Sequence, residues 1–172
     1  ILEWDLLGIR DYYPELYKAH NQISWVPCAS CMDKGFDKEY EIKHDFVFYN
    51  HGDLPFHIIL GIRIPNPKEY PEQFMSNKSD NIEDVLKFLG SGETIVTNSY
   101  HGVYWGTLLK RRVICVPYSS KFWGLKHKPQ YTLPLLWQEV IKDTKIYTDT
   151  LEECREANIN YYKLLCERVG NE

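Results

Sequence analysis

The feature of this sequence that most limits its fold is an alternation of short apolar runs with helical stretches, clearest between residues 94 and 116. Residues 94–97 form a β-branched run, residues 99–110 have a helical pattern, and residues 113–116 form a second apolar run. Two strands joined by one helix over so short a segment must lie parallel, with a right-handed crossover. This unit predicts an α/β fold, a Rossmann-like three-layer sandwich with a mainly parallel sheet.

The rest of the chain extends this pattern. Further strands are predicted at residues 6–9, 23–26, 46–49 and 145–147, with residues 58–60 as a possible addition. Further helices are predicted at residues 11–20, 82–90, 135–142 and 151–169. Asp80 or Asn81 can cap the second of these helices, and residues 33–40 read as a polar loop. We expect one Rossmann-like domain over residues 1–172.

Composition excludes several classes of protein. The net charge is -4, which gives no reason to expect a nucleic acid as partner. No run approaches the roughly 20 apolar residues of a transmembrane helix, and the start of the chain lacks the pattern of a signal peptide. The five cysteines, an odd number without a regular framework, indicate reduced thiols and a cytoplasmic location. The thirteen tyrosines and five tryptophans are interpreted as core and edge aromatics, with a carbohydrate surface as the alternative.

Polar residues follow the predicted strands at the points where ligands bind. In open parallel sheets, the ligand crevice lies beyond the carboxyl ends of the strands. The residues in these positions are Arg10, Cys28, Ser30, Cys31, Asn50, His51, Asn98, Ser99, Tyr100, His101, Gly102, Tyr118, Ser119, Ser120 and Lys121. If all the strands belong to one parallel sheet, these residues share one edge of it.

The strongest local signal is the predicted start of the helix after residue 97. Free N–H groups and the helix dipole make such a position favourable for an anion. His101 can donate to a phosphate or carboxylate there, and Gly102 leaves room for a ligand to approach. The alternative is structural: Asn98 or Ser99 only caps the helix, and Gly102 with Gly106 lets it pack tightly on the sheet.

Cationic side chains near the same edge are further candidates. Lys121 could complete a phosphate clamp, whereas residues 126–128 are expected to be a solvated basic loop. Residues 110–112 most simply complement the carboxyl end of a helix. Arg10 suits a carboxylate or phosphate, although an exposed ion pair with Asp11 or Glu15 is the alternative.

Several common chemistries lack support. Cys28 and Cys31 have the spacing of zinc knuckles and redox pairs, but no second pair follows, so we interpret them as small buried thiols at a strand end and expect no metal. The sequence has no phosphate loop, no dinucleotide-binding glycine fingerprint and no hydrolase nucleophile elbow. ATPase, dehydrogenase and α/β-hydrolase functions are therefore not supported.

The segment at residues 97–109, the strand at 113 and residues 119–122 together resemble the Ser-x-His-Gly, helix, strand, Lys signature of polysaccharide pyruvyl transferases. Residues 8–11 look like the Arg-Asp that opens the C-terminal half of these enzymes, and residues 151–158 are similar to their terminal helix. The resemblance implies a GT-B-like fold of two Rossmann-type domains, of which this chain resembles the second. An N-terminal domain or a second copy of the chain would then be the missing partner.

The resemblance also implies an activity: transfer of a pyruvyl group from phosphoenolpyruvate to sugar hydroxyls of a polysaccharide, forming a ketal without a cofactor. It implies catalytic roles for His101 and Arg10. The residues that it implies for binding the donor are Asn98, Ser99, Tyr100, Gly102, Ser119, Ser120 and Lys121, with Asn50 and His51 at the rim. The isolated chain is expected to bind without efficient catalysis. The alternatives are the nucleotide-sugar domain of a GT-B glycosyltransferase and a non-catalytic binding module.

Overall fold

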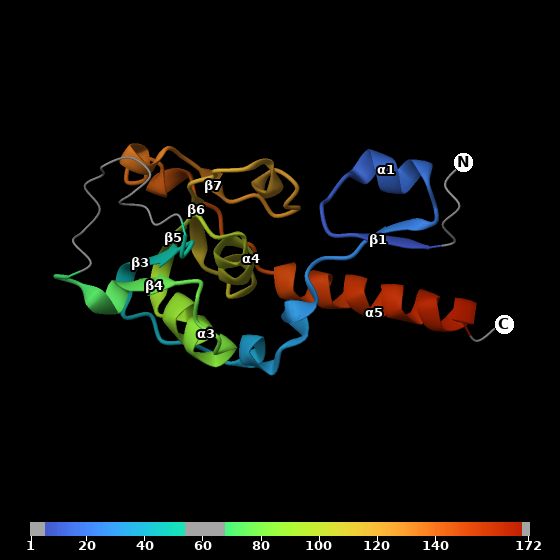
Figure 1. Cartoon of the computed structure of the whole chain (residues 1–172), viewed down its shortest axis with the longest axis horizontal. Helices are drawn as coiled ribbons and strands as arrows, with labels where there is room; N and C mark the ends of the chain where they lie inside the picture. Colours follow the sequence, from blue (N-terminus) through green and yellow to red (C-terminus); the bar gives the residue numbers. More distant parts are fainter. Residues whose placement is uncertain (1–5, 54–67, 170–172) are drawn as a thin grey trace.

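The computed structural model describes residues 6–53 and 68–169, which form two parallel sheets (Figure 1). The strands are β1 (Leu7–Ile9), β2 (Ile23–Trp25), β3 (His44–Asn50), β4 (Phe74–Ser76), β5 (Gly92–Thr97), β6 (Arg112–Cys115) and β7 (Gln130–Tyr131). The helices are α1 (Pro14–Ala19), α3 (Ile82–Gly90), α4 (Tyr100–Leu108) and α5 (Thr150–Val169). The larger sheet has the order β4-β3-β5-β6-β7, and the smaller one pairs β1 with β2.

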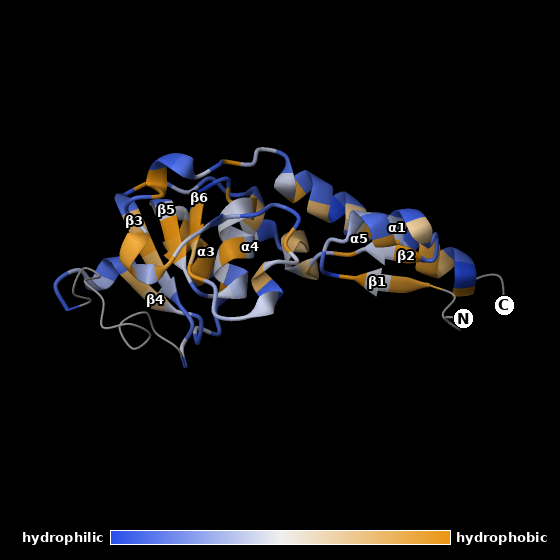
Figure 2. Cartoon of the chain, turned by 90° about the horizontal axis from the view of Figure 1, so that it is seen from above, coloured by the Kyte–Doolittle hydropathy of each residue, from blue (hydrophilic) through white to orange (hydrophobic). Residues whose placement is uncertain are grey.

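Side chains alternate across the larger sheet and build a layer on each face. Val47 and Ile95 belong to the apolar cluster shared with α3 and α4. Their neighbours Phe48 and Val96 point the other way, into a second cluster closed by Trp137. Figure 2 shows the hydrophobic residues concentrated in β3, β5 and β6. The fold is therefore the predicted Rossmann-like sandwich, because a parallel sheet must be covered on both faces.

Most predicted elements are present within a few residues of their expected bounds. The strand–helix–strand unit at residues 94–116 is β5, α4 and β6. Asn81 caps α3, because its side-chain oxygen accepts from the N–H groups of Glu83 at 3.0 Å and Asp84 at 3.4 Å. The predicted long helix at residues 151–169 is α5.

The predicted helix at residues 135–142 is wrong. This stretch contains only two short 3₁₀ turns, Pro134–Leu136 and Ile141–Asp143. The reason is the anchoring of Trp137, which is 4% exposed and packs against the sheet, while the neighbouring Leu135 remains 65% exposed.

Three further expectations need correction. The edge strand beside β6 is β7, which the sequence patterns did not predict. The strand predicted at residues 145–147 is wrong, because these residues form no strand. The loop at residues 33–40 includes a 3₁₀ turn, Lys34–Asp37, whose Phe36 is buried in the core. The possible strand at residues 58–60 lies outside the described residues.

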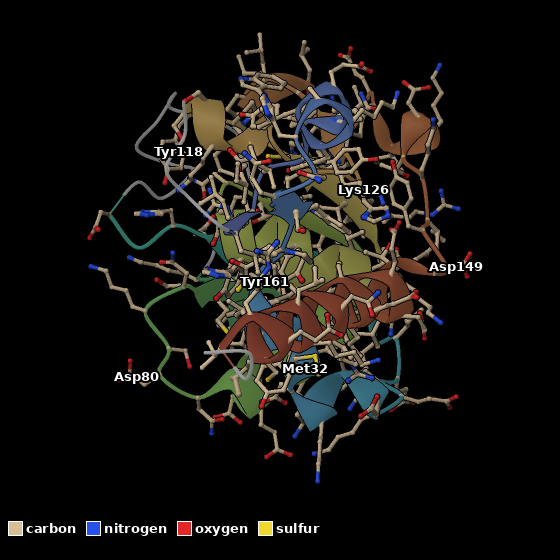
Figure 3. The ribbon with its side chains drawn as sticks, turned by 90° about the vertical axis from the view of Figure 1, so that its right-hand side faces the viewer. Met32, Asp80, Tyr118, Lys126, Asp149 and Tyr161 are labelled. Carbon is tan, nitrogen blue, oxygen red and sulfur yellow. The ribbon has the colours of Figure 1, made fainter. Side chains whose placement is uncertain are left out.

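The β1–β2 pair forms a unit with α1 that rests on α5 (Figures 1 and 3). A side chain at Gly8 would lie 3.0 Å from the ring of Tyr161, so β1 approaches α5 closely. Asn158 of α5 donates to the carbonyl of Pro27 at 3.2 Å. Because these strands pair with each other and not with β3–β7, the expectation that all strand ends share one sheet edge is wrong for β1 and β2. Within the described residues, no helix combines the length and apolarity needed to cross a membrane.

Candidate functional site

The order of the strands defines where a ligand crevice should lie. Among the described residues, the next strand after β3 is β4, which pairs with one side of β3, and the following strand, β5, pairs with the other side. The direction of winding therefore reverses between β3 and β5, and open α/β sheets bind ligands beyond the strand ends at such a switch point. Asn50 and His51 come from the end of β3, and residues 98–102 follow β5.

Hydrogen bonds lock these two strand ends together. The backbone N–H of His51 donates to the side-chain oxygen of Asn98 at 2.7 Å. The hydroxyl of Thr97 donates to the carbonyl of Tyr49 at 2.6 Å and accepts from the N–H of Ser99 at 3.0 Å. Asn98 and Thr97 are fully buried, so they hold the ends of β3 and β5 together beneath the surface.

The side chain of Asn50 offers an acceptor beside this crevice. Its amide oxygen is buried and has no hydrogen-bond partner within the described part of the chain. A buried acceptor without a partner is costly, and a ligand that donates a hydrogen bond would relieve that cost. A sugar or acid hydroxyl fits this description.

The start of α4 lies at the same place. The hydroxyl of Ser99 caps the helix by accepting from the N–H of Gly102 at 3.4 Å. The N–H groups of Tyr100 and His101 precede the first acceptor within the helix. The Tyr100 ring is buried, which raises the pKa of its hydroxyl to about 12, whereas the His101 imidazole is exposed. The arrangement offers N–H donors and one exposed imidazole to an anion.

Packing explains the glycines of this helix. A Cβ at Gly102 would lie 2.3 Å from the Thr97 hydroxyl and 2.7 Å from the Tyr49 ring. A Cβ at Gly106 would lie 2.6 Å from Ile95. The alternative of tight helix–sheet packing is therefore confirmed for both positions, and Ser99 is confirmed as the cap.

Arg10 reaches the start of α4 although β1 belongs to the other sheet. Its guanidinium carbon lies 4.3 Å from the centre of the Tyr100 ring. Its Nε also contacts a carboxylate oxygen of Asp11 at 3.2 Å, so the predicted ion pair is present, with Asp11 and not with Glu15. The backbone N–H of Tyr12 donates to the carbonyl of Gly124 at 2.7 Å, which joins this segment to the loop after β6.

Lys121 lies in that loop after Ser119 and Ser120, and both serines are exposed. The ammonium of Lys121 donates to the hydroxyl of Tyr118 at 2.8 Å and lies 5.3 Å from the centre of the Phe122 ring. None of the salt bridges among the described residues involves Lys121.

Ring contacts connect the loop after β6 to the other candidate residues. The Phe122 ring lies 6.4 Å from the Tyr100 ring, and the Tyr118 ring lies 5.5 Å from the imidazole of His51. Tyr100, in turn, contacts both Arg10 and His101. The loops after β1, β3, β5 and β6 therefore meet at the start of α4.

The prediction of a solvated basic loop is wrong for Lys126 and His127. Both side chains bond to the carboxylate of Glu153 on α5, His127 at 2.8 Å. The Lys126 ammonium also lies over the rings of Tyr12 and Trp25, at 4.7 and 4.5 Å. Burial lowers the pKa of His127, and the nearby Glu153 opposes this shift. These cations hold the loop to α5.

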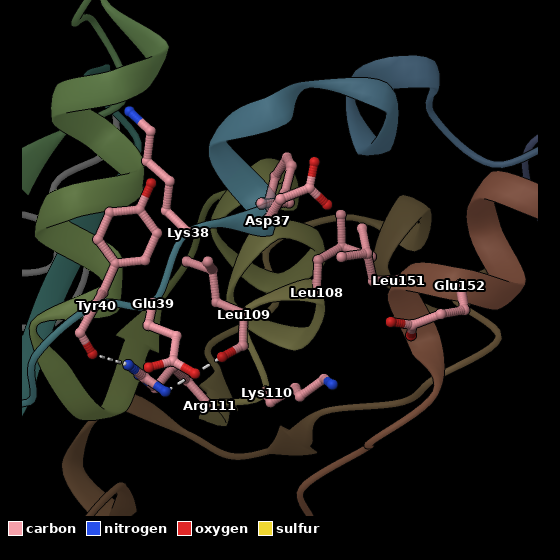
Figure 4. Close-up of a pocket in the computed structure, with 11 residues that line it drawn as sticks. Asp37, Lys38, Glu39, Tyr40, Leu108, Leu109, Lys110, Arg111, Leu151 and Glu152 are labelled. Atoms are coloured by element: carbon pink, nitrogen blue, oxygen red, sulfur yellow. Dashed lines mark hydrogen bonds between the residues drawn. The ribbon is translucent and has the colours of Figure 1, made fainter.

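A cavity of about 530 Å³ lies at the far end of α4 from His101 (Figure 4). Its lining residues are Phe36, Asp37, Lys38, Glu39, Tyr40, Leu108, Leu109, Lys110, Arg111, Leu151 and Glu152. Arg111 donates to the carbonyls of Tyr40 and Gly90 at 2.8 Å and to that of Leu109 at 3.3 Å. Gly90 is the last residue of α3, and Leu109 is the C-cap of α4. The expectation that this basic stretch complements helix ends is therefore confirmed for Arg111, whose guanidinium is bound to backbone carbonyls.

Cys28 is a partner of His101 that the spacing of residues in the sequence does not predict. The Cys28 sulfur lies 3.8 Å from Nε2 of His101 and 3.2 Å from the hydroxyl of Ser30. The hydrogen bond to His101 lowers the pKa of Cys28 to about 7, against the opposing effect of burial. The interpretation of small buried thiols is confirmed for Cys31 and wrong for Cys28, which is partly exposed. Within the described residues, no three His, Cys, Asp or Glu side chains are grouped to hold a metal ion.

Comparison with known proteins identifies the family. A family model described as polysaccharide pyruvyl transferase matches residues 17–120, more than half of the chain. The match includes β3, β5, α4 and β6, whereas Arg10 and Lys121 lie just outside its two ends. No curated protein and no solved structure gave a match. Because this family model covers more than half of the chain, the chain belongs to the polysaccharide pyruvyl transferase family.

Proposed function

We propose that the start of α4 binds phosphoenolpyruvate and that this chain supplies the donor-binding half of a pyruvyl transferase. The observation that carries this proposal is the exposed imidazole of His101 at a helix N-terminus, where the loops bearing Arg10 and Lys121 meet. Phosphoenolpyruvate carries a phosphate and a carboxylate, so its site needs more than one cationic contact. Helix N–H groups and a lysine suit the phosphate, and the planar guanidinium of Arg10 suits the carboxylate.

The remaining candidate residues have supporting roles in this proposal. Ser119 and Ser120 are exposed in the Lys121 loop and offer hydroxyl donors to the phosphate. Asn98, buried under the crevice, positions the backbone of His51 and not the ligand. Asn50 contributes the buried acceptor at the rim.

The chemistry requires an acid. A proton delivered to the methylene carbon of phosphoenolpyruvate makes the adjacent carbon electrophilic, and a sugar hydroxyl then adds to it with loss of its proton. A second hydroxyl of the sugar displaces the phosphate, which leaves as inorganic phosphate, and the ketal closes. His101 is the proposed acid, since its exposed imidazole can donate a proton from the start of α4. Its Nε2 faces the Cys28 thiol, so Nδ1 is the nitrogen left for the substrate.

Binding of the acceptor sugar requires a second domain or a second copy of the chain. The family name implies a polysaccharide acceptor. The outer half of α5 exposes apolar side chains, namely those of Ile159, Tyr162, Leu164, Leu165 and Val169. Clustered exposed apolar residues mark interaction surfaces, which supports our proposal that another domain or a second copy covers α5 and completes the cleft.

A thermal-shift screen tests the donor assignment. Phosphoenolpyruvate at 100 times its dissociation constant should stabilise the chain by about 2.7 kcal/mol. The variant His101→Ala should lose this shift. The control variant His44→Ala should keep it, because His44 begins β3 and so lies at the opposite end of the strands from the proposed site. Stabilisation by a nucleoside diphosphate and not by phosphoenolpyruvate would contradict the proposal and favour a nucleotide-sugar site. An undiminished shift in His101→Ala would remove His101 from the site.

A further inference from the structure

A turn beside His101 holds two cysteines in unlike surroundings. Cys28 precedes the 3₁₀ turn Ala29–Met32, and the N–H of Cys31 points back to the carbonyl of Cys28 at 3.4 Å. A turn of this kind brings its first and fourth Cα atoms within about 7 Å, a separation that a disulfide can span. The backbone therefore holds the Cα atoms of Cys28 and Cys31 within the range that a disulfide requires.

The surroundings of the first cysteine favour a reactive thiol. The Cys28 sulfur contacts Nε2 of His101 and the hydroxyl of Ser30. The His101 ring stacks on the Trp105 ring, with 4.7 Å between centres, and the indole N–H of Trp105 donates to the Ser30 hydroxyl at 2.9 Å. Trp105 therefore holds the imidazole from one face, and Ser30 connects Trp105 to the Cys28 sulfur. The pKa of Cys28 is lowered to about 7 by this contact, and the thiolate is the nucleophilic form.

The surroundings of the second cysteine are those of a protected thiol. Cys31 is fully buried, and burial raises its pKa. Arg155 and Asn158 of α5 hold it, through a bond to its carbonyl at 2.8 Å and a contact to its sulfur at 3.5 Å. The pair thus consists of an accessible, acidic thiol and a sheltered one.

We infer that Cys28 and Cys31 form a redox-active dithiol beside His101, in which Cys28 is the attacking thiol and small hydroperoxides are the oxidants. With a hydroperoxide, the Cys28 sulfur attacks the O–O bond: a sulfur–oxygen bond forms, and the released alkoxide takes a proton and leaves as an alcohol. The Cys31 sulfur then attacks that of Cys28, a disulfide forms, and the oxygen leaves as water with the Cys31 proton. The two thiols are oxidised by two electrons and the peroxide is reduced.

Of the groups around the pair, His101 makes the contact that lowers the pKa of Cys28 most. The titratable or charged neighbours are His101, Tyr100 and Tyr104 on α4, and Cys154 and Arg155 on α5. Burial raises the pKa of Tyr100 and of Cys154 to about 12 and that of Tyr104 further, and an arginine stays charged. Substitution of His101 should therefore be the change that moves the reactivity of Cys28 most.

Alkylation with iodoacetamide between pH 5.5 and 9.5, read for each cysteine by peptide mass spectrometry, tests the first half of the inference. In the folded chain, the rate at Cys28 should be half-maximal near pH 7. In urea it should move to about 8.5, the value of a free thiol. The variant His101→Gln should move the midpoint upward in the folded chain, and His44→Gln should not. Equal midpoints for Cys28 in the folded and unfolded chains would overturn the inference.

Oxidation tests the second half. Treatment of the folded chain with tert-butyl hydroperoxide should yield one peptide pair, linked through Cys28 and Cys31, that has lost two hydrogens and resists alkylation. In Cys31→Ala, the product should stop at a sulfenic acid on Cys28 that dimedone traps. The unsubstituted chain decides the question if that variant does not fold. Oxidation confined to the exposed Cys166, with Cys28 and Cys31 still open to alkylation, would overturn the inference.

Discussion

At the scale of single residues, the imidazole of His101 is held on two sides while the residue stays exposed. Trp105 stacks on one face and the Cys28 thiol contacts Nε2. Such fixation reduces the freedom that a catalytic group must lose when its substrate binds. The imidazole of His101 is therefore already oriented for its proposed role in donor binding.

Lys121 gives the sharpest test of a binding role for one charge. The variant Lys121→Met should weaken phosphoenolpyruvate binding by about 10-fold or more, since a hydrogen bond to a charged group contributes about 1.5–3 kcal/mol. The matched control is Lys128→Met, an exposed lysine of the same loop, which should change the affinity less than about twofold. Isothermal titration calorimetry measures both. Equal losses in the two variants would assign the effect to net charge and not to a contact.

The sequence could predict the candidate residues that depend on local structure, and missed those that depend on distant packing. Ser99 was identifiable because a capping residue and the helix after it are neighbours in the chain. The contact between Cys28 and His101 joins different elements across two sheets, and no spacing rule contains it. The same holds for Lys126, which looked solvated because its partner Glu153 lies on α5.

At the scale of elements, the close packing of α4 on the sheet sets the position of the proposed donor site at the start of α4. Gly102→Ala places a methyl group 2.3 Å from the Thr97 hydroxyl, so it should destabilise the chain by about 1–3 kcal/mol and weaken donor binding as α4 shifts. The control is Gly52→Ala, where the three atoms nearest to the added methyl all belong to the movable side chain of Lys78, so the effect should be smaller. Urea unfolding measures both. A Gly102→Ala chain of full stability would contradict the packing described here.

The contact between the loop after β6 and α5 should make stability depend on pH. Burial lowers the pKa of His127 in the folded state, so the unfolded chain binds the proton more readily. Stability should therefore fall as the pH drops below about 6.5, the ordinary histidine value, toward the lowered one. His127→Asn should reduce this slope. Glu153→Gln should increase it, because the carboxylate opposes the shift. Urea midpoints across pH 5–8 give the slopes, and a slope unaffected by His127→Asn would contradict the assignment.

Elements with a strong repeating pattern were predictable, and elements that depend on their neighbours were not. The apolar stripe of α3 and the β-branched run of β5 are visible in the chain itself. The short strand β7 exists because β6 offers an open edge to Gln130 and Tyr131. Residues 135–142 had a helical pattern, but Trp137 is anchored in the core under the sheet and the stretch folds as turns.

At the scale of the whole molecule, the proposed reaction needs this chain to bind the donor and a second domain, or a second copy of the chain, to complete the acceptor site. The described residues contain the proposed donor site, and the exposed apolar side chains on the outer half of α5 are the proposed contact with a second domain or a second copy. Incubated with phosphoenolpyruvate and a candidate acceptor glycan, this chain alone should bind the donor but release no inorganic phosphate above background. A phosphate assay with mass spectrometry of the glycan measures this. Multiple turnovers by the chain alone would contradict this requirement.

The most direct test of the central claim is chemical-shift mapping of phosphoenolpyruvate binding on the isotope-labelled chain. If phosphoenolpyruvate binds at the start of α4, shifts are expected at the amides of residues 98–102, at the imidazole of His101, and at the side chains of Arg10 and Lys121. No shifts are expected around Arg111 in the cavity at the far end of α4. Shifts confined to that cavity, with His101 unmoved at saturating ligand, would contradict this claim.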